Sequence, residues 1–256
     1  MQPTAYRKEV IQTHENLGGA GGFYQGQRRA LELGSDWVYV ADDDAYASPD
    51  MIERFHAYIN SHDCANISAV CSMVLFLSGE IDYGHRDLFG VDSHLIYQRK
   101  HPEPDSYEKE SFEINIFSYV GTFLNANALR HEGLVDPSFF IFYDDTEHSL
   151  RLSRWGRILC VPSIIVYHEG GGNSASDDGS MNASWRDYYS TRNLFVLLRR
   201  HYFFASLNYF RIYLERIYWY RCETGLRGQI TRDAFWDAYM GRLGKNGKYL
   251  PGVSLA

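Results

Sequence analysis

Three consecutive aspartates, Asp42, Asp43 and Asp44, follow the apolar run 37–41. Open α/β sheets bind ligands in the crevice beyond the carboxyl ends of their strands, and carboxylates there offer the hard oxygen ligands that divalent cations prefer. The same cluster also fits a solvated acidic turn that caps a helix starting at residues 48–50. The aspartates alone therefore indicate either a cation site or a turn.

A glycine-rich segment lies upstream, from Asn16 to Phe23, and a helical pattern follows it. Glycines before a helix let backbone N–H groups approach an anion, and the helix N-terminus favours negative charge. A plain flexible turn is the alternative interpretation. Only the short apolar pair Val10 and Ile11 precedes the segment, so the strand of a dinucleotide fingerprint is missing. The pattern favours a phosphate-bearing ligand over a Rossmann dehydrogenase.

Two further segments end in side chains that could do chemistry. The apolar run 139–143 is followed by Asp144, Asp145 and Glu147, which fit a helix cap, a general base, or both. The β-rich run 158–167 ends at His168, either an ordinary polar residue or a nitrogen ligand. Beside an aspartate cluster at another strand end, the ligand interpretation becomes plausible.

In this order and spacing, the segments resemble family 2 glycosyltransferases of the GT-A fold, and within them the galactofuranosyltransferase and rhamnosyltransferase branch. The resemblance runs from Glu15 to about His201 and includes Trp185 to Tyr189 and the pair Arg192-Asn193. It implies an α/β fold of the GT-A type, which is Rossmann-like, with a mostly parallel sheet flanked by helices.

The resemblance assigns Asp42 and Asp44 to the family's D-x-D element, which holds a divalent cation against the pyrophosphate of a nucleotide-sugar donor. His168 matches a further metal ligand, and Asp43 stands between the two aspartates as a neighbour within the donor-binding stretch. Asn16, Gly18 and Gly19 match the loop that lines the donor. Mixed carboxylate and imidazole ligation suits Mn²⁺, with Mg²⁺ as the alternative.

Asp145 matches the family's general base, Asp144 is counted with it as a catalytic residue, and Glu147 matches an acid at the acceptor site. The implied reaction is inverting transfer of galactofuranose or rhamnose from a UDP- or dTDP-sugar donor to a glycan or lipid-linked glycan acceptor. Such a transfer needs one base for the acceptor hydroxyl and one group that stabilises the leaving diphosphate.

Family members begin with a strand, a helix and a second strand before the glycine-rich loop, whereas here the loop starts at residue 16. The resemblance therefore implies that the N-terminal nucleotide-binding strands are missing. Two rival functions stay open: a non-catalytic truncated remnant, and a metal-dependent phosphoryl-transfer enzyme or hydrolase that uses Asp42, Asp44 and His168 without an acceptor.

Strand and helix patterns alternate along the chain. Strands are expected at 37–41, 69–77, 118–125 and 158–167, and helices at 22–33 and 49–61. Such alternation indicates a largely parallel sheet with helices on both faces. The polar stretch 79–111, which contains His85, is expected to form an antiparallel excursion and a loop, with a metal site as the less favoured alternative. A catalytic domain is expected at 1–190 and a helical extension at 191–256.

The composition of the chain indicates which partners and which cellular location to expect. The net charge of −7 argues against nucleic acid, which selects a basic face. The scattered cysteines and the lack of a long apolar span favour a reduced, cytoplasmic protein. The aromatic and basic stretch 193–220 fits a helix packed on the catalytic domain, or an interfacial surface that docks on anionic lipid at the inner face of the membrane. The stretch 170–182 is expected to form a loop beside the site.

Overall fold

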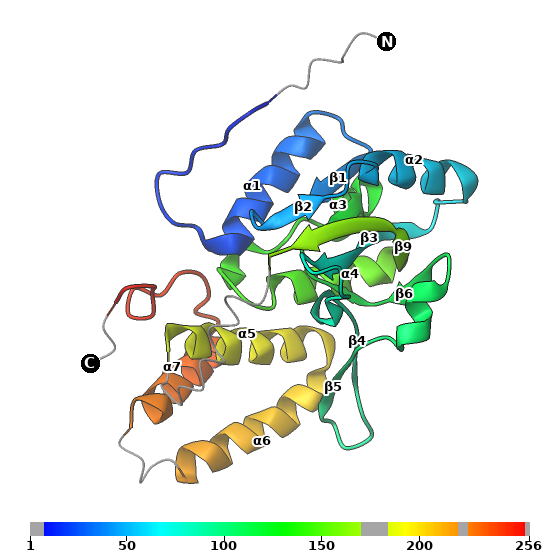
Figure 1. Cartoon of the computed structure of the whole chain (residues 1–256). Coiled ribbons are helices and arrows are strands. Elements are labelled where there is room, and N and C mark those ends of the chain that lie inside the picture. Colours follow the sequence, from blue (N-terminus) through cyan, green and yellow to red (C-terminus); the bar gives the residue numbers. More distant parts are fainter. Residues whose placement is uncertain (1–7, 170–183, 220–224, 254–256) are drawn as a thin grey trace.

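A six-stranded sheet forms the centre of the protein, in a computed structural model that describes residues 8–169, 184–219 and 225–253. The strand order is β1-β8-β3-β9-β2, and β6 also pairs with β9 (Figure 1). The strands are β1 (Trp37–Val40), β2 (Ala45–Ala47), β3 (Ile67–Phe76), β6 (Phe112–Ile114), β8 (Thr122–Asn125) and β9 (Arg157–His168). The loop expected at 170–182 lies outside the described residues.

The sheet is mixed, so the prediction of a mostly parallel sheet is wrong. Among the described strands only β3 and β9 pair in parallel, and β8 runs antiparallel between β1 and β3. The alternation of strands with helices does give β1, β3 and β9 one common direction, because each returns through a crossover. The short strands β2, β6 and β8 run in the opposite direction, β8 inside the sheet and β2 and β6 beside β9, and their few residues carry little periodic signal.

The long strands β3 and β9 form the core of the sheet. Most of their residues are buried on both faces, which explains their nearly continuous apolar sequences. The parallel register shifts where Ser72 pairs with Val161 but Met73 pairs with Ile165. Pro162 lies in this irregularity, where a residue that cannot donate a ladder hydrogen bond is tolerated.

Helices cover both faces of the sheet, as expected from the sequence. Helix α2 packs through Phe55 against the face that carries Val70 and Phe123, while the opposite face carries Ala69 and packs against the other helices. This alternation follows from the two-residue period of a strand. The helices of this part are α1 (Gly18–Glu32), α2 (Met51–Ser61), α3 (Ala126–Glu132) and α4 (Asp144–Trp155), with the short 3₁₀ turns η1 (Tyr83–His85), η2 (Pro104–Glu108) and η3 (Pro137–Phe139).

The polar stretch 79–111 forms the antiparallel excursion that the sequence predicts. Strand β4 (Arg86–Val91) pairs with β5 (Tyr97–Lys100) and with β7 (Ile116–Phe117). Arg86 is fully buried and its guanidinium donates to the backbone carbonyl oxygens of Ser72 and Val120. The hydrogen bonds of its planar guanidinium thereby connect the β4–β5 hairpin to the central sheet.

Three helices follow the sheet: α5 (Trp185–His201), α6 (Phe203–Trp219) and α7 (Leu226–Met240), which lie together at one end of the molecule (Figure 1). The expected continuous helix over 193–220 is interrupted at Tyr202, whose ψ of 65° is not helical. The boundary expected at residue 190 lies inside α5, and the division into two domains stays a prediction.

None of the helices in the described part of the chain is both long and apolar enough to cross a membrane. In that same part, Cys71 and Cys160 are buried, Cys64 is half-buried, and none of the three forms a disulfide.

Candidate active site

The short strand β2 places the aspartate turn, residues 42–44, beside the end of β9. It pairs antiparallel with β9 so that Ala45 lies opposite His168. The backbone N–H of Glu169 donates to the carbonyl oxygen of Asp44 at 3.0 Å. As a result, the imidazole Nε2 of His168 lies 3.4 Å from the Asp44 carboxylate Oδ1. The structure therefore brings together two predicted metal ligands that are far apart in the sequence.

Asp42, the third predicted metal ligand, lies in the same cluster. Burial raises its pKa to about 6, and the neighbouring carboxylates of Asp44 and Asp145 add to the shift. Asp43 is exposed. The cluster thus concentrates more negative charge than its surroundings compensate, and a divalent cation would relieve this repulsion. The oxygen and nitrogen donors suit Mn²⁺ or Mg²⁺, so the residues present fit the predicted cation.

Asp144 and Asp145 form the N-terminus of α4, where the helix dipole favours negative charge. The Asp145 carboxylate accepts hydrogen bonds from the Thr146 N–H at 2.6 Å and from the Thr146 hydroxyl at 3.1 Å. Burial raises the pKa of Asp145, while the bonds from Thr146 and the charge of Arg99 oppose that rise. Burial and the carboxylate of Asp145 raise the pKa of Asp144. One carboxylate of the pair is therefore poised to take a proton.

A strained loop precedes this helix. Phe140, Phe142 and Tyr143 all have left-handed backbones, with φ of 66°, 65° and 61°. Gly18 at the start of α1 packs directly on the loop, and a Cβ at Gly18 would lie only 2.1 Å from the carbonyl oxygen of Phe140. Ala20 N–H donates to that same oxygen at 3.1 Å. The glycine-rich segment thus packs against the loop that precedes Asp144 and Asp145 and helps to hold it in place.

Helix α5 holds the strained loop from the other side. The buried Asn193 amide donates to the carbonyl oxygens of Phe139, Ile141 and Phe142 at 2.9, 2.8 and 2.9 Å. The neighbouring Arg192 is also buried and donates to Phe139 at 3.0 Å. Left-handed residues persist where their surroundings compensate the strain, and these bonds provide that compensation.

A cavity of about 440 Å³ opens between the two aspartate clusters. Asp42, Asp144 and Asp145 all line it. Its lining residues are Gly19, Phe23, Asp42, Arg99, Ser118, Tyr119, Ile141, Phe142, Tyr143, Asp144, Asp145, Thr146 and Ser190. The cavity is thus bordered by one candidate cation ligand, Asp42, and by the candidate base, Asp145.

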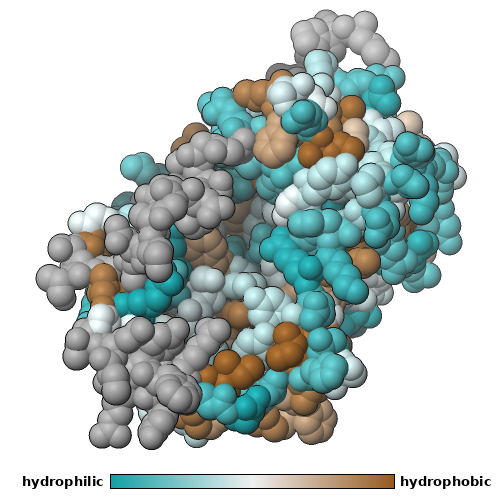
Figure 2. Space-filling model, turned by 60° about the horizontal axis from the view of Figure 1, so that its bottom comes forward, coloured by the Kyte–Doolittle hydropathy of each residue, from teal (hydrophilic) through white to brown (hydrophobic). Residues whose placement is uncertain are grey.

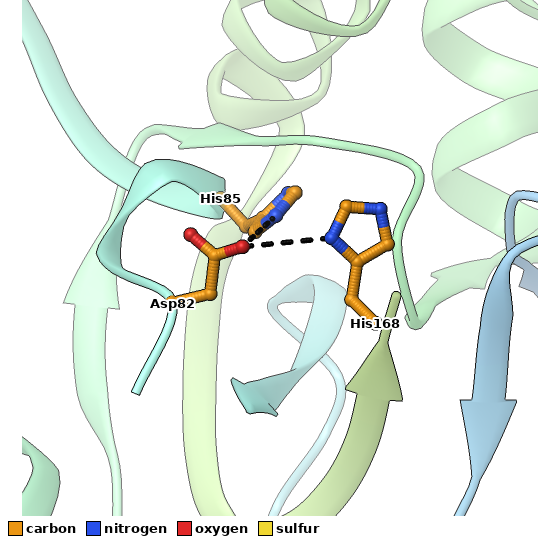
Figure 3. Close-up of side chains that lie close together, drawn as sticks. All are labelled: Asp82, His85 and His168. Carbon is orange, nitrogen blue, oxygen red and sulfur yellow. Dashed lines mark hydrogen bonds and ion pairs between the residues drawn. The ribbon is translucent and has the colours of Figure 1, made fainter. Parts of the chain in front are cut away.

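A second layer of polar side chains stands behind His168 (Figure 3). The Asp82 carboxylate Oδ2 lies 3.5 Å from His168 Nδ1 and 3.0 Å from His85 Nε2. His85 Nδ1 lies 2.7 Å from the hydroxyl of Ser118, which lines the cavity. Burial alone would raise the pKa of Asp82, but the hydrogen bonds from His85, the Gly84 N–H and His168 together with the charge of His85 lower this pKa to about 2.

The predicted donor-loop residues do not all line the same cavity in the structure. Helix α1 begins at Gly18, so the glycines form its first turns instead of a free loop. The side chain of Asn16 accepts the N–H of Gly18, the first residue of α1, at 2.8 Å, while the N-cap position itself is Leu17. Asn16 lies on a different hollow beside Lys245, while Gly19 lines the main cavity.

Glu147 does not line the main cavity either. Its carboxylate is buried in an ion-pair network with Arg151 Nε at 2.9 Å, His201 Nε2 at 3.3 Å and Arg200 at 3.4 Å. On the helix, Glu147 lies two residues after Asp145, a spacing that turns the two side chains to different faces. Its contacts are those of a structural ion pair between α4 and α5.

Sequence reasoning did not assign Arg99, Asp82 or His85 to the site. Arg99 reaches the cavity from β5 while its guanidinium bonds to the buried Asp87 and to the Gly84 carbonyl oxygen. The only local signal was the three-residue spacing of Asp82 and His85. Their approach to His168 depends on the pairing of β3 with β9, which places Phe76 opposite His168, and on the bridge between Leu75 near the end of β3 and Ile81.

A likeness to a solved structure supports the fold class. The crystal structure of GalNAc-T7 with UDP, GalNAc and Mn²⁺ aligns with 74% of this chain and 36% of that chain, at a TM-score of 0.51 and 15% identity. At this identity the likeness concerns the fold alone. The protein thus has an α/β fold with a mixed sheet and C-terminal helices, similar to a GT-A glycosyltransferase.

The sequence comparisons define the family. The profile of glycosyl transferase family 2 matches residues 2–132, so the chain belongs to this family. Galactofuranosyltransferase GlfT1 of Mycobacterium tuberculosis is 32% identical over 147 residues, 56% of this chain and 46% of that protein. The dTDP-rhamnosyl transferase RfbF of Shigella flexneri is 23% identical over 198 residues, 76% of this chain and 61% of that protein. The matched region spans about half the length of the mycobacterial relatives.

Proposed function

We propose that this protein is a metal-dependent inverting glycosyltransferase that moves a sugar from a nucleotide diphosphate donor to a glycan or lipid-linked glycan. One observation carries the proposal: Asp42 and the Asp144-Asp145 pair line one cavity, and the contact of Asp44 with His168 lies in the same aspartate cluster as Asp42, although these residues come from three distant segments. A cation site and a base at one cavity match the two needs of glycosyl transfer.

In the proposed reaction, Asp145 accepts the proton of the acceptor hydroxyl. The acceptor oxygen forms its bond to the anomeric carbon as the bond from that carbon to the diphosphate oxygen breaks on the opposite face. The nucleoside diphosphate leaves with the electron pair, and the anomeric configuration inverts. A bound Mn²⁺ or Mg²⁺ would neutralise the charge that develops on the leaving diphosphate.

The remaining side chains position these groups. Asp42, Asp44 and His168 would hold the cation, and Gly19 on the cavity lining leaves room for the donor. Arg99 lies near Asp145 and favours its ionised form, the form that can act as a base. Asp144 stays next to it, where a shared proton would keep the pair from carrying two full charges.

The donor we propose carries galactofuranose or rhamnose on UDP or dTDP. The support is similarity to a galactofuranosyltransferase and a dTDP-rhamnosyl transferase, whose names give those sugars for those proteins. UDP-galactofuranose and dTDP-rhamnose should be incubated with the protein, Mn²⁺ and short galactan or rhamnan acceptors, and the products analysed by mass spectrometry. Acceptor lengthened by one hexose or deoxyhexose is the expected product.

The same assay separates transfer from hydrolysis. A phosphoryl-transfer enzyme or hydrolase would release nucleotide at the same rate with or without acceptor, while a transferase should need the acceptor. A remnant without activity would yield neither product. In that case, failure of a nucleotide sugar with Mn²⁺ to raise the melting temperature would identify the remnant.

A further inference from the structure

The Asp82 carboxylate contacts two imidazole rings, those of His85 and His168 (Figure 3). Its Oδ2 atom is 3.0 Å from His85 Nε2 and 3.5 Å from His168 Nδ1. The two rings are arranged edge to face, with centroids 4.8 Å apart. A carboxylate oxygen can accept from both rings at once, so the geometry supports donation by both histidines to Asp82.

The backbone fixes Asp82 in this place. Its N–H donates to the carbonyl oxygen of Val74 on β3 at 2.9 Å, and its Oδ1 accepts the N–H of Gly84 at 3.2 Å. The side chains of Asp82, His85 and His168 are only 15%, 14% and 14% exposed. Buried polar groups need partners, and these three supply one another's.

The opposite edge of the His168 ring faces the aspartate turn. Its Nε2 lies 3.4 Å from Asp44 Oδ1. In a neutral imidazole, one nitrogen carries the proton and the other keeps a lone pair. If Nδ1 donates its proton to Asp82, the lone pair is on Nε2 and points to the side where Asp44 would hold a cation. Histidines that bind metals commonly donate their other nitrogen to a carboxylate in this way.

We propose that Asp82 is a positioning residue that holds His168 in the Nδ1–H tautomer, so that Nε2 is the ligand atom offered to the cation. His85 holds Asp82 in turn and connects it to Ser118 on the cavity wall. This inference rests on the proposed function for the identity of the cation, but the tautomer itself depends only on the contacts described here.

The same three side chains could instead form a separate cation site, since their ligand atoms all lie within 4.8 Å of one another. A cation there would have to replace both hydrogen bonds to Asp82 Oδ2. It would also take the Nδ1 lone pair of His168, which places the ring proton on Nε2 and removes Nε2 as a ligand for the predicted cation at Asp44. The positioning role keeps both hydrogen bonds to Asp82 Oδ2 and leaves the Nε2 lone pair for that cation, which is why we favour it.

The test compares wild-type protein with Asp82→Ala and with the isosteric Asp82→Asn. The second variant keeps the proposal testable if Asp82→Ala does not fold. Mn²⁺ binding is measured by electron paramagnetic resonance in the presence of UDP, and the His168 tautomer by ¹⁵N NMR of histidine-labelled protein. His168→Gln assigns the resonance. Asp105→Asn, which changes an exposed carboxylate on η2, serves as the matched control.

Both Asp82 variants should bind Mn²⁺ about 10- to 100-fold more weakly, as expected for loss of an outer partner of a metal-binding histidine. In Asp82→Ala the His168 proton should move to Nε2, next to Asp44. Saturating Mn²⁺ should restore turnover in Asp82→Asn, since a ligand that is merely misplaced can be compensated by cation concentration. The control should match wild type in both measurements.

Mn²⁺ affinity within twofold of wild type in both variants, with an unchanged tautomer, would overturn the inference. So would a second bound cation per chain that disappears in Asp82→Ala and His85→Ala while the first remains. A wild-type protein that binds Mn²⁺ but transfers no sugar would contradict the proposed function alone, because the affinity and tautomer comparisons would still decide the role of Asp82.

Discussion

At the scale of single residues, carboxylates of one chemical type behave differently because their neighbours differ. Burial raises the pKa of Asp42 and Asp145, where like charges or few cations surround them. Burial would also raise the pKa of Glu147, but His201 and Arg151 outweigh it and lower this pKa to about 2. The first two carboxylates are suited to binding a cation or a proton, and Glu147 to holding helices together.

Replacing Glu147 should therefore affect stability. Its pKa falls from an ordinary value of 4.5 to about 2 on folding, which corresponds to about 3 kcal/mol of stabilisation. Because the folded-state value is depressed, this contribution is complete above the unfolded pKa and is lost as pH falls through about 2. We expect Glu147→Gln to lower the free energy of unfolding by about 3 kcal/mol at pH 7, with a smaller difference at pH 3.

Urea denaturation at both pH values measures this difference. Glu113→Gln is the matched control, because Glu113 pairs with Arg157 on the surface, where both side chains are more than half exposed. That change should cost about 1 kcal/mol or less. Equal effects of the two substitutions would show that the Glu147 network contributes no more than a surface pair.

Arg99 should set the acidic limb of the pH profile. Its positive charge opposes the rise in the pKa of Asp145 that burial causes. A base must be ionised to act, so activity is lost as pH falls below its pKa. We expect Arg99→Gln to move the acidic limb of kcat to higher pH and Arg99→Lys to restore much of it. An unchanged limb in Arg99→Gln would exclude this electrostatic role.

At the scale of elements, the loop 139–143 connects three parts of the site. Gly18 of α1 packs against it, Asp144 of α4 follows it, and Asn193 of α5 bonds to its carbonyl groups. Its left-handed residues would not be chosen by their own preferences, since Phe and Tyr rarely adopt positive φ. The loop is therefore positioned by its neighbours.

Removing the Asn193 amide should loosen this loop. Asn193→Ala leaves buried carbonyl groups without donors, at a cost of about 1–3 kcal/mol in stability. Even a small shift in the position of the Asp145 carboxylate should lower kcat by about 10- to 100-fold, with a smaller change in donor KM. Steady-state kinetics below the melting temperature measure both values.

Asn60→Ala, which changes an exposed asparagine near the end of α2, should leave kinetics and stability near wild type. An Asn193→Ala protein that is less stable but keeps its wild-type kcat would show that Asn193 has a structural role only.

Much of the central architecture could be predicted from the sequence, because long apolar strands such as β3 and β9 carry a strong pattern. The three-residue strand β2 carries almost none, yet its register is what brings Asp44 to His168. Asp82 was missed for a related reason, since its approach to His168 arises from pairing between distant segments. Local patterns predicted which residues bear chemistry, and tertiary register determined which of them meet.

At the scale of the whole molecule, an apolar stripe on α6 stands apart from the candidate active site. Phe203, Phe204, Leu207 and Leu214 are 58%, 70%, 51% and 43% exposed. Figure 2 turns this end of the molecule forward and shows hydrophobic side chains gathered among polar ones. Three of the four recur at helical spacing, and the exposed Arg211 lies among them.

Aromatic side chains beside basic ones on one helix face favour the headgroup region of a membrane. We expect the protein to co-sediment with vesicles that contain phosphatidylglycerol and to bind less to vesicles of phosphatidylcholine alone. The double substitution Phe203→Ser and Phe204→Ser should reduce this binding. Absence of wild-type binding to the anionic vesicles would contradict a membrane role for α6.

Above all, we propose that Asp145 acts as the base in the cavity that Asp42 of the cation cluster also lines. The most direct measurement is kcat of Asp145→Asn at saturating Mn²⁺ and donor, beside the Mn²⁺ affinity of the same variant. Turnover should fall by about a hundredfold or more while Mn²⁺ affinity stays near wild type. A variant that keeps wild-type turnover within a few-fold would contradict the claim.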